Sequence, residues 1–119
     1  PQPSSLEDLE AVTATLFRRV DHLDPGVQAV LDTDVGRDAR RATLPARLAS
    51  MRSGLTNAAP DLAESDLDHL VRLGLVLTSS FSRRAWREYF DFDADAAAAE
   101  VAWALRAAIT GARSGGGRR

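Results

Sequence analysis

The residues best suited to acid–base or metal chemistry in this chain are two histidines and several closely spaced aspartates. His22 and His69 fall on different predicted helices, and neither has a second histidine at a metal-ligand spacing. Asp66 and Asp68 are two residues apart, so they point to different faces of a helix and cannot share a site. The absence of cysteine excludes disulfides, thiol nucleophiles and cysteine-rich zinc sites. This set of residues favours no catalytic centre and no cofactor.

A third acidic group, Asp91, Asp93 and Asp95, alternates along the chain as the ligands of a calcium loop do. It lacks the glycine and the distal glutamate of such a loop, so we interpret it as helix capping, where negative charge suits the N-terminus. His69, next to Asp68, is interpreted as a surface residue. We therefore expect neither an enzyme nor a metal protein, and we keep a small helical enzyme as an alternative.

Composition predicts one all-α domain. The 119 residues are 45% hydrophobic but only 6% aromatic, and alanine, a strong helix former, is the commonest residue. All fifteen basic residues are arginine, which together with the alanines indicates a GC-rich bacterial genome. The net charge of -2 would not draw the chain itself to the phosphates of DNA. No apolar run approaches the roughly 20 residues of a membrane span, and the start lacks the features of a signal peptide, so we expect a cytoplasmic protein without membrane contact.

Apolar residues repeat at steps of three and four over five stretches, which predicts a bundle of five to six helices. The first stretch opens with the capping-box pair Ser4 and Glu7, and the short second one opens with Asp24 and Pro25. Pro45 lies inside the third stretch, where we expect a kink. The five stretches cover approximately residues 4–22, 25–31, 37–56, 65–80 and 93–112.

The last two of these helices are apolar on nearly all sides, and an arginine- and aromatic-rich connector, residues 79–92, joins them. A chain this short cannot enclose such helices by itself, so we predict that they pair with their copies in a four-helix bundle across a homodimer. A monomer that exposes one alanine face is the alternative. The predicted dimer-interface residues are Leu67, Leu70, Leu77, Ala97, Val101, Leu105 and Ala108.

The order of these parts is a long helix, a short one opened by Asp-Pro, an arginine-rich helix, an apolar helix, a Trp-Arg-x-Tyr-Phe connector and a last helix with Val101 to Ala107. This order resembles the C-terminal effector-binding and dimerisation domain of tetracycline-repressor-like (TetR) transcription regulators. The resemblance covers nearly the whole chain and is strongest between Leu70 and Ile109. It implies that the earlier helices enclose a ligand pocket and that the last two helices dimerise.

The resemblance also implies a sensing function, in which a largely apolar small molecule shifts the spacing of two DNA-binding heads. The candidate pocket residues are large and apolar yet close to a polar group. Phe17 and Leu48 have simple core packing as an alternative, and Arg52 would matter only for an anionic effector. The nine candidates are Phe17, Val20, Leu48, Met51, Arg52, Leu55, Leu75, Ser79 and Trp86.

Residues 1–112 are therefore expected to form an all-α ligand-binding and dimerisation domain, and residues 113–119 a disordered Gly/Arg tail. The helix-turn-helix with which the family contacts DNA has no counterpart in this chain. The start at Pro1 favours a fragment of a longer protein over a stand-alone domain. Two other interpretations stay open: a constitutive dimerisation module without ligand, and a winged-helix element at residues 65–78.

Overall fold

The structure is a computed structural model that describes residues 6–23 and 25–115. The described residues form six helices and no strand, which confirms the prediction of an all-α protein of five to six helices. Ser4 and Asp24, the expected caps of the first two helices, lie outside the described residues. The helices are α1 (Leu6–Asp21), α2 (Pro25–Leu31), α3 (Asp34–Ala58), α4 (Glu64–Leu77), α5 (Ser80–Phe90) and α6 (Ala94–Gly115).

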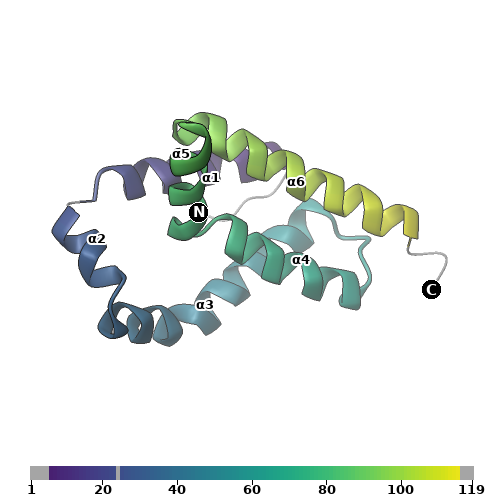
Figure 1. The fold of residues 1–119 in the computed structure, drawn as a ribbon. Helices are drawn as coiled ribbons and strands as arrows, with labels where there is room; N and C mark the ends of the chain where they lie inside the picture. The colour runs from purple at the N-terminus through teal and green to yellow at the C-terminus, as the bar shows by residue number, and fades with distance from the viewer. Residues whose placement is uncertain (1–5, 24, 116–119) are drawn as a thin grey trace.

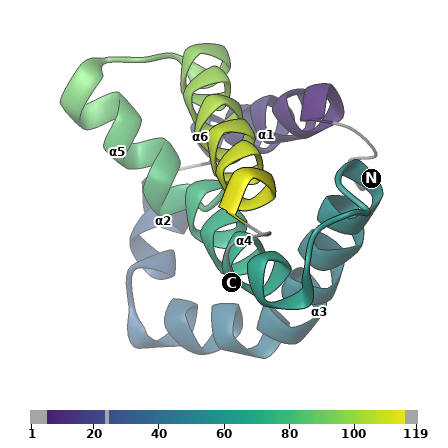
Figure 2. The ribbon, with the colours of Figure 1, turned by 90° about the vertical axis from the view of Figure 1, so that its right-hand side faces the viewer.

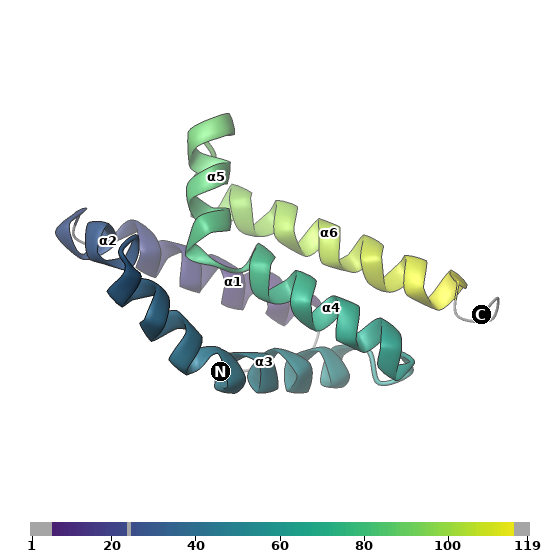
Figure 3. The ribbon, with the colours of Figure 1, turned by 60° about the horizontal axis from the view of Figure 1, so that its bottom comes forward.

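The helices leave a cavity between α1, α3, α4 and α5 instead of packing into a solid bundle. Figure 1 shows α1, α2 and α3 following one another in an arc, with α4 and α5 on the remaining side. In Figures 2 and 3, α4 lies between α6 and α3, while α5 lies to one side of the N-terminal end of α6. The Cα radius of gyration is 14.9 Å, whereas a closely packed domain of this length has about 13.5 Å. The excess matches an arrangement that is open on one side.

The first hydrophobic core lies between α1 and α6. The inward face of α6 consists mainly of alanines, which let the axes of the two helices approach closely. Phe17 and Leu105 are the largest side chains in this core, and both are fully buried. The complete set of buried residues in this core is Leu9, Ala14, Phe17, Ala94, Ala97, Ala98, Val101 and Leu105.

A second core joins the end of α3 to α4 and to the C-terminal half of α6. Leu55 and Ile109 are fully buried at its centre. Gly74 of α4 lets Met51 of α3 come close, because a Cβ at position 74 would lie 2.9 Å from the Met51 Sδ. The two cores together hold α6 in place, and they leave the first half of α3 without a packing partner of comparable size.

Helix α3 begins earlier than predicted and bends. It starts at Asp34 instead of near Arg37, because Thr33 caps it by accepting a hydrogen bond from the Gly36 amide at 3.4 Å. Gly36 is buried against α2, where a Cβ would stand 2.6 Å from the Leu31 Cα. Pro45 lies inside the helix, and Figure 3 shows that α3 changes direction along its length. The predicted kink agrees with this bend, since proline cannot donate to the preceding turn.

The predicted connector between the last two apolar stretches is largely a helix, α5. Ser79 begins it by accepting a hydrogen bond from the Ser82 amide at 3.3 Å. Asp91 ends it in the left-handed conformation, with φ of 56°, and its amide bonds to the Arg87 carbonyl. The Ser79 cap is the signal in the sequence that the prediction overlooked.

A buried arginine attaches α5 to the rest of the chain. Arg83 is only 3% exposed and donates two hydrogen bonds to Asp21 at the end of α1, from Nε at 2.8 Å and from Nη2 at 3.1 Å. Its Nη1 donates to the carbonyl of Phe92 at 2.9 Å. One guanidinium therefore holds the end of α1, the body of α5 and the segment that leads into α6.

At both ends of α6 the structure can be compared with a prediction, that of a helix cap at the start and that of a disordered tail at the end. At the start, the Asp93 carboxylate accepts a hydrogen bond from the Ala96 amide at 2.8 Å, so the capping interpretation is confirmed for this residue. At the end, α6 continues to Gly115, so the prediction of disorder is wrong for residues 113–115. Arg113 makes a two-bond ion pair with Asp61, which extends the order of the helix. Residues 116–119 of the predicted tail lie outside the described residues.

None of the helices in the described part of the chain combines the length and the apolar character needed to span a membrane.

Candidate ligand-binding site

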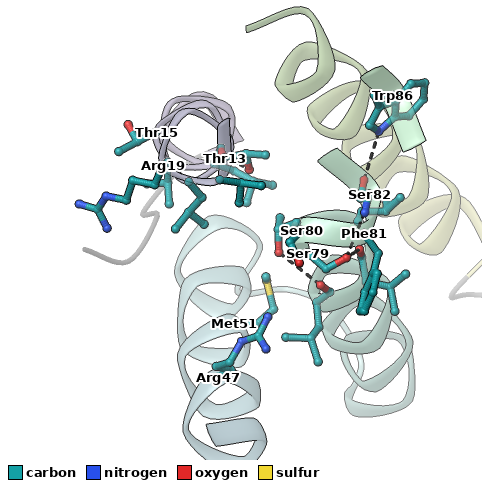
Figure 4. Close-up of a pocket in the computed structure, with 18 of the residues that line it drawn as sticks. Thr13, Thr15, Arg19, Arg47, Met51, Ser79, Ser80, Phe81, Ser82 and Trp86 are labelled. Carbon is teal, nitrogen blue, oxygen red and sulfur yellow. Dashed lines mark hydrogen bonds between the residues drawn. The ribbon is translucent and has the colours of Figure 1, made fainter. Parts of the chain in front are cut away.

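The cavity between α1, α3, α4 and α5 has a volume of about 1230 Å³ and is open to solvent. Pockets that bind drug-sized molecules have volumes of roughly 300–1,000 Å³, so this cavity is large enough for such a ligand. Figure 4 shows the wall of α1 facing Met51 of α3 and residues 79–86 at the junction of α4 and α5.

The cavity has an apolar interior in which several helices take part. The face of α1 that contains Val12, Leu16 and Val20 forms one wall, and Leu75 of α4 and Trp86 of α5 also line the cavity. Met51, the only methionine of the chain, covers part of the α3 wall. A methionine side chain adapts its shape readily, so this wall can adjust to ligands of different outline.

The charged groups along the cavity have one sign. Three arginines line it, Arg19, Arg40 and Arg47, and none of the lining residues within 6–23 and 25–115 is an aspartate or glutamate. The chain as a whole carries a net charge of -2, so the positive lining is a local feature of the fold. A ligand with a negative group would be attracted by these arginines.

The three arginines differ in how they are engaged. Arg40 donates a short hydrogen bond to the Leu31 carbonyl, and its guanidinium stands 4.9 Å from the centre of the Phe81 ring. Arg19 is exposed, and in Figure 4 it points away from the cavity. Arg47 is half-buried and extends beside Met51 towards the interior (Figure 4). Arg47 is therefore the guanidinium best placed to meet a ligand.

Hydroxyl groups line the cavity where α4 passes into α5. Thr78 and Ser79 donate to backbone carbonyls of the last turn of α4, at 2.7 Å and 2.6 Å, and Ser82 accepts from the indole nitrogen of Trp86 at 3.2 Å. These hydroxyl groups are fixed in direction by their bonds. Ser80 also lines the cavity, and Figure 4 shows it on the wall opposite Arg47. Such groups supply a polar strip within a mostly apolar site.

Five of the nine sequence-predicted pocket residues line this cavity: Val20, Met51, Leu75, Ser79 and Trp86. The other four lie elsewhere. Phe17 and Leu55 are fully buried in the first and second cores, and Leu48 packs against the second core, so none of the three reaches the cavity. This placement corresponds to the core-packing alternative for Phe17 and Leu48.

Arg52, the fourth, is engaged with acidic residues of α4 on the outside of the molecule. It forms a short hydrogen bond with Asp68 and an ion pair with Glu64 at 3.2 Å. The hydrogen bond that Arg52 donates to Asp68, followed by attraction to the same carboxylate and to Glu64, raises the pKa of Arg52 above its ordinary value. Its charge stabilises the contact between α3 and α4, and it does not line the cavity.

The sequence prediction missed Arg47, Leu16 and Phe81, which also line the cavity. The first two were open to detection. Arg47 precedes Met51 by four residues and therefore shares its helix face, as Leu16 does with the predicted Val20. Phe81 follows the overlooked cap of α5, so its orientation depended on an element that had not been predicted.

The structure corrects the predicted dimer interface. Leu67, Leu70, Ala97, Val101 and Leu105 are buried inside the single chain, so they cannot also face a partner. Leu77 and Ala108 are half-buried against the two cores. The helical stripes were identified correctly, but the stripe that faces inward was assigned to the interface.

A different apolar face remains exposed on α4 and α6. Trp103 is 66% exposed in the middle of a stripe of α6 that includes Ala99 and Ala107. Leu73 of α4, 41% exposed, borders the shallow groove between α4 and α6. An indole ring in water on a helix of alanines is unusual for an isolated surface and suits an interface.

Among residues 6–23 and 25–115, no group of three or more histidine, cysteine, aspartate or glutamate side chains is placed to hold a metal ion. Asp91 and Asp95, which precede and follow the capping residue Asp93 by two positions, are both exposed. The Asp95 carboxylate forms an ion pair with Arg18 at 3.2 Å. His69 is exposed and contacts Arg72 at 3.2 Å, in agreement with its interpretation as a surface residue.

Comparison with family models, with curated proteins and with solved structures gives no match to this chain.

Proposed function

We propose that this chain is the effector-sensing and dimerisation domain of a bacterial transcription regulator of the TetR-like type. The observation that carries the proposal is the cavity of about 1230 Å³ between α1, α3, α4 and α5. It combines an apolar lining with a few convergent polar groups, as small-molecule sites do. The alternative of a dimerisation module without ligand predicts a filled core at this position, so the cavity supports the sensor.

The proposed signal passes through α1. This helix contributes Phe17 to the core with α6 and, one residue earlier, Leu16 to the cavity. A ligand that fits one separation of α1 and α3 better than another shifts the population towards that separation. A DNA-binding domain that precedes α1 in a longer chain would receive this displacement directly, and DNA would be contacted only through that domain.

The proposed dimer uses the exposed face of α4 and α6 described above. Trp103 supplies a large anchor, and the neighbouring Ala99 and Ala107 let a partner helix approach closely. Pairing α4 and α6 with their copies would form the four-helix bundle expected from the sequence. The contact surface of α6 would then be the exposed stripe around Trp103 and not the buried stripe around Val101.

The test of ligand binding is a fluorescence titration with N-phenyl-1-naphthylamine, an uncharged apolar dye that brightens in apolar sites. We expect saturable binding of one dye per chain. Ala85→Trp places a large ring in the cavity wall and should weaken binding at least tenfold. Ala46→Trp is the matched control, because Ala46 is exposed on α3 and does not line the cavity. Absence of dye binding, or equal binding by the two variants, would contradict the proposal.

The test of assembly is native mass spectrometry of the purified chain and of Trp103→Asp. We expect a dimer for the natural sequence and a folded monomer for the variant, because two carboxylates would face each other across the interface. Val30→Asp, at an exposed position of α2, should remain dimeric. A monomeric natural chain would exclude the dimer.

A further inference from the structure

We propose that the ligand of the cavity is an amphipathic anion, an aliphatic or aromatic body with a carboxylate that pairs with Arg47. This inference rests on the proposed function and adds the chemical class of the effector. Its basis is the one-signed charge of the lining residues and the state of the individual arginines.

The first step concerns the charge that Arg47 leaves unbalanced. Across the described part of the chain, Arg18, Arg37, Arg52, Arg83, Arg84, Arg87 and Arg113 form ion pairs with carboxylates. Arg47 makes no such pair within the described residues, although it is half-buried. A partly desolvated guanidinium without a counterion is costly, and an incoming carboxylate would offset that cost with two charge-assisted hydrogen bonds.

The second step excludes the other cations of the cavity. Arg40 already bonds to the Leu31 carbonyl and stacks on Phe81, so its guanidinium is engaged within the protein. Arg19 points outward (Figure 4) and can act only at long range. The anionic group of the ligand is therefore expected beside Arg47, on the α3 wall.

The third step places the apolar part. On α3, Met51 lies beside Arg47 in the cavity wall (Figure 4). Leu75 of α4 and the α1 residues Leu16 and Val20 line the same cavity, so apolar side chains from three helices are available to the body of the ligand. The cavity has room for an extended chain or a ring system, and its opening to solvent lets the charged end remain partly hydrated.

The experiment compares three probes with the same ten-carbon chain: decanoate, decanol and decyltrimethylammonium. Displacement of N-phenyl-1-naphthylamine from the protein is measured for each probe at neutral pH, below the critical micelle concentrations of the two ionic probes and below the solubility limit of decanol. We expect decanoate to bind at least tenfold more tightly than the cation. Arg47→Met keeps an apolar side chain of similar length, and it should weaken decanoate about tenfold while leaving decanol unchanged.

The matched control is Arg41→Met, which removes one positive charge from an exposed position of the same helix. It should leave all three affinities unchanged, so a general loss of charge is separated from the loss of Arg47. Equal affinities of decanoate and decyltrimethylammonium, or decanoate binding that Arg47→Met does not alter, would overturn the inference. If the dye itself fails to bind the natural chain, the proposed function fails; if the dye binds but charge has no effect, this inference alone fails.

Discussion

The two faces of α1 have opposite packing. Phe17 looks inward onto the alanines of α6 and is fully buried, whereas Leu16, its neighbour in sequence, looks into the cavity and is 38% exposed. One face belongs to a closely packed core, and the other to an open wall. The same helix thus contributes both to the core with α6 and to the wall of the open cavity.

The contrast extends to whole regions. Helix α6 has a continuous buried side from Ala94 to Ile109, while α2 has no buried residue and α3 before Pro45 buries only Gly36. Regions with little buried apolar surface open at a low cost in free energy, and binding sites that move are drawn from such regions. We therefore expect the core around α6 to keep its structure when a ligand binds, while α2 and the first half of α3 adjust their positions.

The largest expected effect comes from the two neighbours on α1. Phe17→Ala should lower the free energy of unfolding by about 3–5 kcal/mol, because it removes a buried ring and leaves a cavity in the core. Leu16→Ala should cost less than about 1 kcal/mol, since its side chain is already in contact with solvent. Urea denaturation of both variants measures the difference. Equal losses would show that the two faces are not distinct.

The buried pair of α1 and α5 gives the next largest effect. Asp21→Ala should destabilise by about 3 kcal/mol, because Arg83 would keep its charge in a buried position with only the Phe92 carbonyl as acceptor. Asp32→Ala, which breaks the more exposed pair with Arg84, should cost less than about 1 kcal/mol. Thermal unfolding measures the loss of stability in the two variants. A larger loss in Asp32→Ala than in Asp21→Ala would refute the role of Arg83 in attaching α5 to α1.

A smaller effect is expected where α4 meets the cavity. Gly74→Ala puts a Cβ at 2.9 Å from the Met51 Sδ, and the flexible methionine should move towards the cavity. The gain in helix propensity of about 1 kcal/mol offsets this displacement, so stability should change little. The affinity for N-phenyl-1-naphthylamine should fall several-fold.

The control for that variant is Gly111→Ala in α6, where the added Cβ has no atom within 4 Å. It should stabilise the helix and leave dye binding unchanged. Equal dye affinity of the two variants would mean that Gly74 does not control the position of Met51 at the cavity wall.

The smallest expected effect on stability concerns the ion pair of Asp61 with Arg113 at the C-terminal end of α6. The hydrogen bonds from Arg113 hold the pKa of Asp61 below its ordinary value. Since the pKa is lowered in the folded chain, the pair stabilises the end of α6 above the ordinary carboxyl range and is lost as the pH falls through the lowered pKa. An NMR titration of the Asp61 carboxyl carbon should give a pKa below about 3.9, rising in Arg113→Gln. An unchanged titration in the variant would disprove the pairing.

The sequence predicted the helices of this fold better than the directions in which their faces point. Periodicity located the stripes of α6, but it could not tell that Ala97 and Val101 face α1 and that Trp103 faces outward, because both stripes consist of small or apolar residues. The choice depends on which neighbour each stripe meets, and that is a property of the tertiary fold.

The candidate site shows a similar limit. The choice of large apolar residues close to polar groups, made under the family resemblance, included Val20, Met51 and Leu75 of the cavity wall. The wall formed by α5 depended on the cap at Ser79 and on the contact of Arg83 with Asp21, 62 residues away. A long-range ion pair of this kind leaves no periodic signal. Arg52 was predicted to line the pocket, but its ion pairs with Glu64 and Asp68 of α4 hold its side chain outside the cavity.

The most direct test of the central claim uses the only methionine of the chain, Met51, which lies in the cavity wall. Protein labelled with ¹³C at the methionine methyl group should give a single NMR signal that shifts progressively and saturates as decanoate is added. The shift should be several-fold smaller in Ala85→Trp at the same decanoate concentration. A Met51 signal that stays in place while decanoate binds would contradict the assignment of this cavity as the ligand site.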